Sequence, residues 1–358
     1  MLASLCVIYF VAGRLGLKVA FVHPYVTPIW IPSGVALAAF ILCGYEVWPA
    51  ILLGSFLDHV TRAGLTANTF SIPLASVLEG IAGAYVVKKF AYGAKAFDSA
   101  KGVFLFVLLG CVCATVINPT VGISFDYLQG HIGVGDIGFR WLSWWLAHGI
   151  GALLVAPFLI LVFRTTHHGL DAGEVRELTV LLLGLIFVCL LVFGPLSRSL
   201  NKDQIVQVWV CVPFLIWAAF RFCPLEAAGT TLILFGTAIW GTLHGYGSFV
   251  ARNLTTSLIL LDTFIGVIGT MTLVVAAMVV ERRHIEGELL GTQSLLQDAV
   301  ERKERDLVVT VRALEVEMTG HGQTKRALHE SQERFQRLAE NTSLDDLGEI
   351  QKGRERLE

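Results

Sequence analysis

The chain has 358 residues, of which 54% are hydrophobic and 16% are charged, and its mean hydropathy is +0.66. These values exclude a soluble protein. Of the 27 Lys and Arg and the 29 Asp and Glu, 13 and 17 lie in residues 281–358. We therefore expect a membrane-embedded part over residues 1–280 and a water-facing arm after it. No basic face suggests nucleic acid as a partner.

Apolar stretches divide the first part into candidate membrane-spanning helices, because a span needs about 20 apolar residues. The candidates are Leu2–Val22, Ile31–Gly44, Val47–Val60, Phe70–Val87, Val103–Ile123, Trp141–Phe163, Leu178–Gly194, Ile205–Phe222, Ala227–Leu243 and Ser257–Val280. Several are short, and the second and third can be read as one broken hairpin. The predicted fold is an all-α polytopic membrane protein with a bundle of about eight to ten transmembrane helices. The first stretch has no basic n-region, so we expect a spanning helix and not a cleaved signal peptide.

A proline-rich segment, residues 23–34, follows the first span. Its three prolines recur every four residues; each lacks an N–H and disfavours helical backbone at the preceding residue. Non-helical backbone inside a membrane is stable only where protein or a water-filled cavity satisfies its polar groups. We expect the other spans to close around this elbow and to place Thr27, Trp30 and Ser33 in a ligand site. The alternative is a turn among the head groups that binds nothing.

Polar residues inside the later spans are further candidates for ligand binding, because such residues are costly in a membrane and by default indicate function. The ionisable candidates are Asp58 with His59, Glu79, His148, Arg221 with Glu226, and Asp262, and the ligand-binding residues we expect among the later spans are Asp58, Glu79, Asn118, Trp144, His148 and Arg221. Glu79 is the most deeply placed by sequence, and we expect it either to contact a ligand or to form half of a buried ion pair.

Three tryptophans precede His148 within one stretch, at positions 141, 144 and 145. They indicate either an aromatic-walled pocket with His148 as its polar group or an interfacial aromatic belt. Asn118-Pro119 interrupts the fifth span and would free a backbone carbonyl, which suits a cavity or a simple kink.

Lys and Arg in the connecting segments indicate the orientation. One face of the ten-span arrangement carries Lys88, Lys89, Lys95, Lys101, Arg164, Arg176, Arg282 and Arg283, and the other carries Arg62, Arg140, Arg198, Lys202 and Arg252. The positive-inside rule places the first face and the C-terminal arm in the cytoplasm.

The arm begins with a heptad-like pattern over residues 281–318. Positions separated by four and three residues are Ile285, Leu289, Thr292, Leu296, Ala299 and Lys303, and after a four-residue slip Leu307, Val311, Leu314 and Met318. This predicts a cytoplasmic two-stranded coiled coil, hence a homodimer, in which the slip acts as a stutter. A single amphipathic helix lying on its own membrane domain is the alternative.

The rest of the arm is predicted to be interrupted. Two glycines within Thr319–Gly322 are poor helix formers and indicate a break, followed by a second helical stretch within residues 319–343. Residues 344–358 form a charged tail that resembles no domain of its own.

Signatures of catalysis are missing from the sequence, which has no phosphate loop, no His-Glu-x-x-His and no Gly-x-Ser-x-Gly. The seven cysteines lie in or beside apolar runs without metal-site spacing. We expect no catalytic residues, no cofactor and no metal site in this segment.

Several motifs resemble the first type of bacterial membrane-associated sensor domain, the MASE family, over most of residues 1–280. They are Ala12–Leu17, Val26–Gly34, Trp48-Pro49, Leu53–Leu57, Leu78–Gly80, Gly83–Tyr85, Trp144–Leu146, Val155–Pro157 and Trp217–Phe222. One departure is Ala147-His148, where the family pattern leads us to expect Gly-Asp, so that aspartate has no counterpart here. Residues 330–341 are similar to the helix that leads into a PAS sensor domain, but no PAS core follows.

The resemblance implies the input half of a larger signalling protein whose output is a histidine kinase, of a two-component system, or a cyclic-di-GMP enzyme such as a diguanylate cyclase. We expect a multi-pass sensor of the bacterial inner membrane that detects a small molecule or a membrane partner protein. The coiled coil would relay the signal by shifting an equilibrium between two packings. The alternative is a transporter-like protein that moves a small solute, because broken helices near the midplane also form substrate sites.

Overall fold

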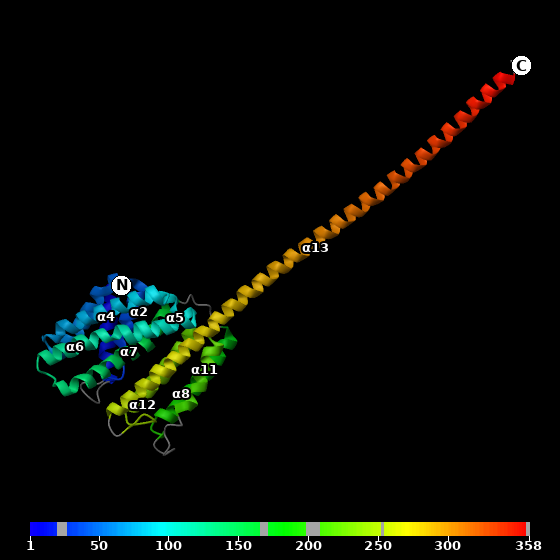
Figure 1. The fold of residues 1–358 in the computed structure, drawn as a ribbon. Helices are drawn as coiled ribbons and strands as arrows, with labels where there is room; N and C mark the ends of the chain where they lie inside the picture. The colour runs from blue at the N-terminus through cyan, green and yellow to red at the C-terminus, as the bar shows by residue number, and fades with distance from the viewer. Residues whose placement is uncertain (20–26, 165–170, 198–207, 252–253, 356–358) are drawn as a thin grey trace. The chain divides into compact units, whose positions relative to one another are not determined.

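A computed structural model describes residues 1–19, 27–164, 171–197, 208–251 and 254–355 (Figure 1). These ranges contain helices and connecting turns and no β-strand. The chain divides into two compact units, Met1–His284 and Ile285–Glu358. The two units are described separately below.

The helices of the first unit follow the predicted spans in order, except that the fifth span, Val103–Ile123, is divided among several shorter helices. The α-helices of the unit are α1 (Leu2–Val19), α2 (Ile31–Cys43), α3 (Trp48–Ala63), α4 (Asn68–Phe90), α5 (Ala100–Leu105), α6 (Ile117–Leu128), α7 (Val134–Arg164), α8 (Ala172–Phe193), α11 (Val212–Arg221), α12 (Pro224–Leu243) and the start of α13 (Leu254–Glu355). Short 3₁₀ segments are η1 (Tyr45–Val47), η2 (Gly93–Asp98), η4 (Ala114–Val116) and η5 (Trp209–Cys211). A π-helix, η3 (Phe106–Cys113), joins α5 to η4.

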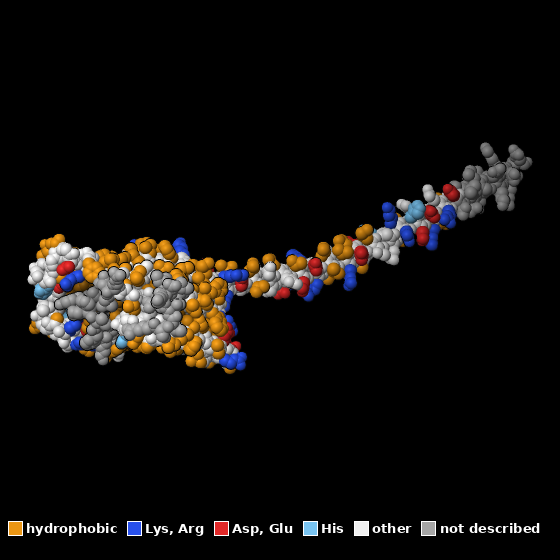
Figure 2. Space-filling model, turned by 90° about the horizontal axis from the view of Figure 1, so that it is seen from below, with side chains coloured by type: hydrophobic (Ala, Val, Ile, Leu, Met, Phe, Trp, Pro, Cys, Tyr) orange, Lys and Arg blue, Asp and Glu red, His pale blue; other side chains and the backbone are white. Residues whose placement is uncertain are grey.

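Five of these helical runs are long and apolar enough to cross a membrane. They are Asn68–Phe90, Ala100–Leu128, Val134–Arg164, Ala172–Phe193 and, through its apolar start, Thr256–Glu340; shorter apolar helices are Leu2–Leu17, Ile31–Cys43 and Trp209–Arg221. Hydrophobic side chains cover most of the face of the first unit seen in Figure 2. The predicted class, an all-α polytopic membrane protein, is confirmed.

The centre of the first unit is α2, in which every residue from Pro32 to Ile41 is buried. Its 13 residues span only about 20 Å, less than the roughly 30 Å of a bilayer core. It packs closely on α7, where glycines let the two backbones approach. A Cβ on Gly34 would overlap the carbonyl oxygen of Gly151, and a Cβ on Gly151 would overlap that of Trp30. α2 is therefore a half-length helix locked against a long one.

The elbow before α2 is only partly as predicted. Residues 23–26 lie outside the described part of the chain, and Thr27–Trp30 are non-helical. The expectation that the irregular segment extends to Gly34 is wrong, because Ile31 to Gly34 form the first turn of α2. Pro32 is the second residue of that helix, where its missing N–H has no intrahelical partner to lose.

The second unit is the C-terminal part of α13, which runs without interruption from Leu254 to Glu355. The predicted break at Thr319–Gly322 is wrong. A glycine in a helix costs only about 1 kcal/mol relative to alanine, and good helix formers flank this segment on both sides. The Thr319 hydroxyl also donates to the Glu315 carbonyl at 2.7 Å, as threonines inside helices do. The charged tail predicted after residue 343 is helical as far as Glu355.

Candidate functional site

A buried histidine–carboxylate pair joins α4 to α7. Glu79 on α4 is 6% exposed and His148 on α7 is 2% exposed. The imidazole Nδ1 lies 2.9 Å from Glu79 Oε1 and 3.2 Å from Oε2. A polar pair at this depth is stable only when its hydrogen bonds are made, and here both partners satisfy each other.

Trp144 fixes the tautomer of His148. Its indole Nε1 donates to His148 Nε2 at 2.8 Å, one helical turn along α7. An indole nitrogen can only donate, so Nε2 must accept, and we assign the imidazole proton to Nδ1. His148 is then neutral and donates to Glu79. The three side chains form a directed chain, Trp144 to His148 to Glu79, and a second proton on His148 would cost the bond to Trp144.

Trp30 and Ser33, the elbow residues at the start of α2, contact the hydrogen-bonded series Trp144, His148 and Glu79. The Ser33 hydroxyl lies 2.8 Å from the His148 carbonyl and 2.8 Å from the Trp30 carbonyl. The Trp30 backbone N–H donates to the Ala147 carbonyl at 2.9 Å, and its ring stacks on the imidazole with centroids 6.0 Å apart. Five of the residues predicted as ligand-binding are thus brought together, namely Trp30, Ser33, Glu79, Trp144 and His148.

Asn118 on α6 reaches the same helix as Glu79. Its Nδ2 donates to the Ser76 hydroxyl at 2.9 Å, one turn before Glu79 on α4. Its side-chain oxygen is buried and meets no hydrogen-bond partner among the residues that the structure describes. Ser76 also lies beside the buried phenol of Tyr9 from α1. Sequence reasoning missed Ser76 and Tyr9, because a serine among small residues and a tyrosine in an apolar run give no signal of their own.

The remaining predicted residues lie apart from this centre. The Thr27 hydroxyl donates to the nearby Ile29 carbonyl at 2.9 Å. Asp58 on α3 is 1% exposed and lies between two arginines, Arg14 on α1 and Arg62, each with a nitrogen 3.7 Å from a carboxylate oxygen.

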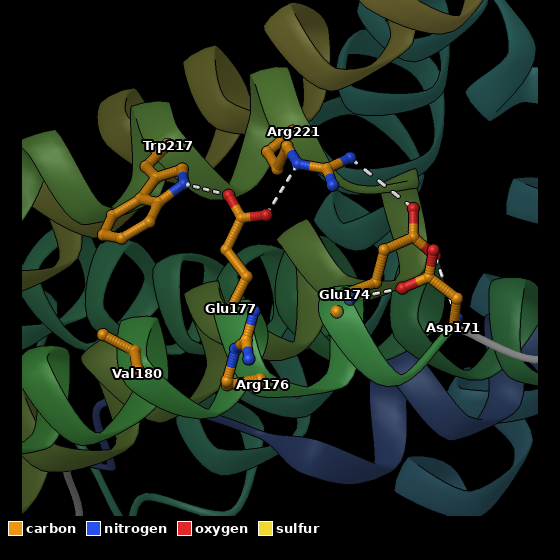
Figure 3. A pocket seen from close by; sticks show the side chains of 8 residues that line it. Asp171, Glu174, Arg176, Glu177, Val180, Trp217 and Arg221 are labelled. Carbon is orange, nitrogen blue, oxygen red and sulfur yellow. Dashed lines mark hydrogen bonds and ion pairs between the residues drawn. The ribbon is translucent and has the colours of Figure 1, made fainter.

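Arg221 belongs to a third place, an open groove of about 460 Å³ between α8 and α11 (Figure 3). Its Nε lies 2.8 Å from Glu177 Oε2, and its Nη1 lies 3.5 Å from Glu174 Oε1. The Trp217 indole donates to the other Glu177 oxygen at 3.0 Å. Arg221 therefore ties two helices together and does not reach Glu79.

Two side chains near the end of the first unit anchor α13. Glu281 accepts a hydrogen bond from the Ala100 N–H at the start of α5, at 3.1 Å. Arg283 donates to the Phe220 carbonyl at the end of α11, at 2.8 Å. α13 is thus fastened to two separate parts of the unit by contacts that the sequence did not indicate.

The chain is similar to a known protein family and to a known protein. The MASE1 family model matches residues 1–283. The probable diguanylate cyclase DgcE of Escherichia coli (strain K12) is 25% identical over an alignment of 237 residues, and the alignment covers 63% of this chain and 20% of that protein. The matched part thus spans about a fifth of that relative's length. No solved structure matches. Among the described residues, no group of three His, Cys, Asp or Glu could hold a metal ion. The family match covers well over half of the chain, which therefore belongs to the MASE1 family of membrane sensory domains.

Proposed function

We propose that this chain is the signal-input module of a bacterial inner-membrane receptor, with its C-terminal arm in the cytoplasm. The observation that carries the proposal is the chain Trp144–His148–Glu79 buried where α2, α4 and α7 meet. Buried polar groups of this kind are expensive in a membrane and are retained where they serve function. The signal is a small molecule or a membrane partner protein that changes the hydrogen bonds of this centre.

The centre can act as a two-state element because its bonds are shared. A partner that binds Glu79 must compete with its bond to His148, which ties α4 to α7, and a turn of the imidazole then disturbs its stacking on Trp30 beside α2. Ligand binding can bias such an equilibrium only by its differential affinity for the two arrangements. The motion reaches α13 through its fastenings at Glu281 and Arg283.

The second unit supports relay through a paired helix. The apolar positions of its heptad-like pattern are largely exposed on the single chain, among them Ile285 at 59%, Leu289 at 58%, Leu296 at 61%, Leu307 at 63% and Leu314 at 53%. A second copy of α13 would bury this seam as a two-stranded coiled coil. The stutter after Lys303 offers two packings of similar energy. The output domain would be a histidine kinase or a cyclic-di-GMP enzyme, and the name of the relative, a probable diguanylate cyclase, favours the second.

The test uses the full-length parent protein and measures its output activity with and without the stimulus, or its basal activity where the stimulus is unidentified. We expect Glu79→Gln and His148→Gln each to fix the output at one level, with the protein still inserted in the membrane. Glu46→Gln, at an exposed glutamate of the same unit, is the control and should behave as wild type. Wild-type signalling by both site variants would contradict the proposal.

A transporter-like function is the second candidate, because a non-helical segment beside a half-length helix also marks substrate sites in transporters. Solute counterflow in proteoliposomes distinguishes the two functions. Counterflow that Glu79→Gln abolishes would favour transport.

A further inference from the structure

Two arginines and one aspartate form a cluster, Arg14–Asp58–Arg62, at the end of the first unit opposite the fastenings of α13. Asp58 and Arg62 lie near the end of α3, just before α4 begins. α4 is 23 residues long, which corresponds to about 34 Å, and leads to η2 and to Ala100, which bonds Glu281. In the orientation proposed above, on which this placement depends, the cluster faces the outer side of the membrane.

The carboxylate of Asp58 is buried and yet makes no hydrogen bond. Its side chain is 2% exposed, and neither oxygen has a hydrogen-bond partner in the described part of the chain. Gly13 makes room for it, since a Cβ there would come within 3.1 Å of the carboxyl group. The nearest nitrogens of Arg14 and Arg62 stay at 3.7 Å, beyond hydrogen-bond length.

Other ion pairs of the same unit are in direct hydrogen-bond contact, unlike the Asp58 cluster. Arg164 Nη1 lies 2.7 Å from Asp98 Oδ1, with a second bond from Nη2 to the other oxygen. Arg221 meets Glu177 at 2.8 Å. These pairs tie helices together with the donors aimed at the acid. In the cluster around Asp58, the two guanidinium groups lie near the carboxylate but do not hydrogen-bond it.

The charge of the cluster is unbalanced. Two guanidinium groups face one carboxylate, and the structure brings no second acid to Arg62 among the described residues, only Asp58 and the like charge of Arg14. Arg14 donates one hydrogen bond to the Thr61 hydroxyl. Arg62 donates no hydrogen bond among the described residues. Both arginine side chains remain accessible, at 37% and 39% exposure. An excess of forked donors and one positive charge is thus presented at the surface.

We propose that Arg14 and Arg62 form a binding site for an oxyanion, a phosphate or carboxylate group, held between two guanidinium groups above Asp58. Arginine forks match the two oxygens of such groups and bind them in pairs of parallel hydrogen bonds. Asp58 offsets one of the two positive charges, which lowers the repulsion between the arginines while no anion is bound. The oxyanion comes either from a free small molecule or from the head group of an anionic lipid, since both offer the same oxygens.

Calorimetry on the purified chain tests the free anion, with inorganic phosphate and succinate as probes at constant ionic strength. Arg14→Gln and Arg62→Gln should each weaken binding about tenfold or more, because each removes one charge-assisted contact. Arg140→Gln is the matched control, a positive charge on α7 at the same end of the unit, and should bind as wild type. Equal weakening by the control would show unspecific attraction and overturn the site.

Nanodiscs of phosphatidylcholine with and without phosphatidylglycerol test the lipid source. Stabilisation by phosphatidylglycerol alone, lost in Arg62→Gln but not in Arg140→Gln, assigns the oxyanion to a head group. Binding of neither phosphate, succinate nor phosphatidylglycerol by the wild type overturns the proposal. Arg14→Lys and Arg62→Lys keep the charge and lose the forked donors, so they carry the test if a glutamine variant fails to insert.

Asp58→Asn separates a binding site from an ion cluster that only stabilises the fold. Removing the acid should lower thermal stability and tighten binding of phosphate severalfold, because the anion then faces two uncompensated charges. A loss of stability with unchanged binding would contradict the role given to Asp58. All of these measurements concern binding alone, so their failure leaves the signalling test of the Glu79 centre untouched, and the reverse also holds.

Discussion

The Glu79–His148 pair and the Glu177–Arg221 pair use similar chemistry in opposite surroundings. In the first, the side chains are 8% and 3% exposed and the bond joins two neighbouring helices, α4 and α7. In the second, they are 29% and 42% exposed and line an open groove. Water can replace the second pair but not the first, so only the first can force a helix to move when its partner changes.

The largest expected effect comes from leaving Glu79 without its partner. His148→Leu removes the donor, and a buried unpaired charge costs about 3–5 kcal/mol. We expect a large fall in the thermal midpoint of the detergent-solubilised protein. The double variant Glu79→Leu/His148→Leu should recover part of the loss, and a double variant as unstable as the single one would mean that packing, not charge, dominates.

A smaller loss is expected where α2 meets α7. Gly151→Ala places a methyl group against the Trp30 carbonyl, and overpacking of this kind costs about 1–3 kcal/mol. Thermal unfolding of the solubilised protein measures it. Gly236→Ala on α12, where a Cβ meets nothing within 4 Å, is the control. Equal effects of the two variants would show that the close approach of the helices does not matter.

Removing the exposed pair Glu177–Arg221 should lower the thermal midpoint least. Glu177→Gln leaves the groove open to water, which replaces the lost bonds, so the midpoint should stay near that of wild type. The same measurement as for His148→Leu checks it. A loss as large as that at His148 would remove the distinction between the two pairs.

A gain is expected in the arm. Gly320→Ala lies in the middle of α13 in open space, and alanine is favoured over glycine by about 1 kcal/mol in a helix interior. Hydrogen exchange of the amides around residue 320 in the intact chain should slow. Unchanged exchange there would mean that this part of the helix is fastened by something other than its own backbone.

The helices were predictable because hydropathy reports length and burial locally, and each apolar run contains enough residues to show it. The site was predictable only as a set of expensive polar residues. That Glu79 pairs with His148, 69 residues away, depends on which spans are neighbours, and no local pattern encodes this.

The errors have local causes. Two glycines, at 320 and 322, predict a helix break, whereas a long run of good helix formers outweighs two modest penalties. The predicted elbow is too long because a proline in the first turn begins a helix instead of breaking it, and Pro32 lies in the first turn of α2. The sequence points to Asp58 but not to Arg14 and Arg62, since charges near the ends of spans look like ordinary anchors.

The hydrogen bond from Trp144 to His148 gives the centre its own optical reporter. A protonated imidazole withdraws electrons from an excited indole and dims its emission, whereas the neutral ring bonded here does so far less. Any event that adds a proton to His148, or turns it away, changes the light that Trp144 emits. In a variant whose other seven tryptophans are replaced by phenylalanine, the occupancy of the centre can thus be followed without attaching a dye.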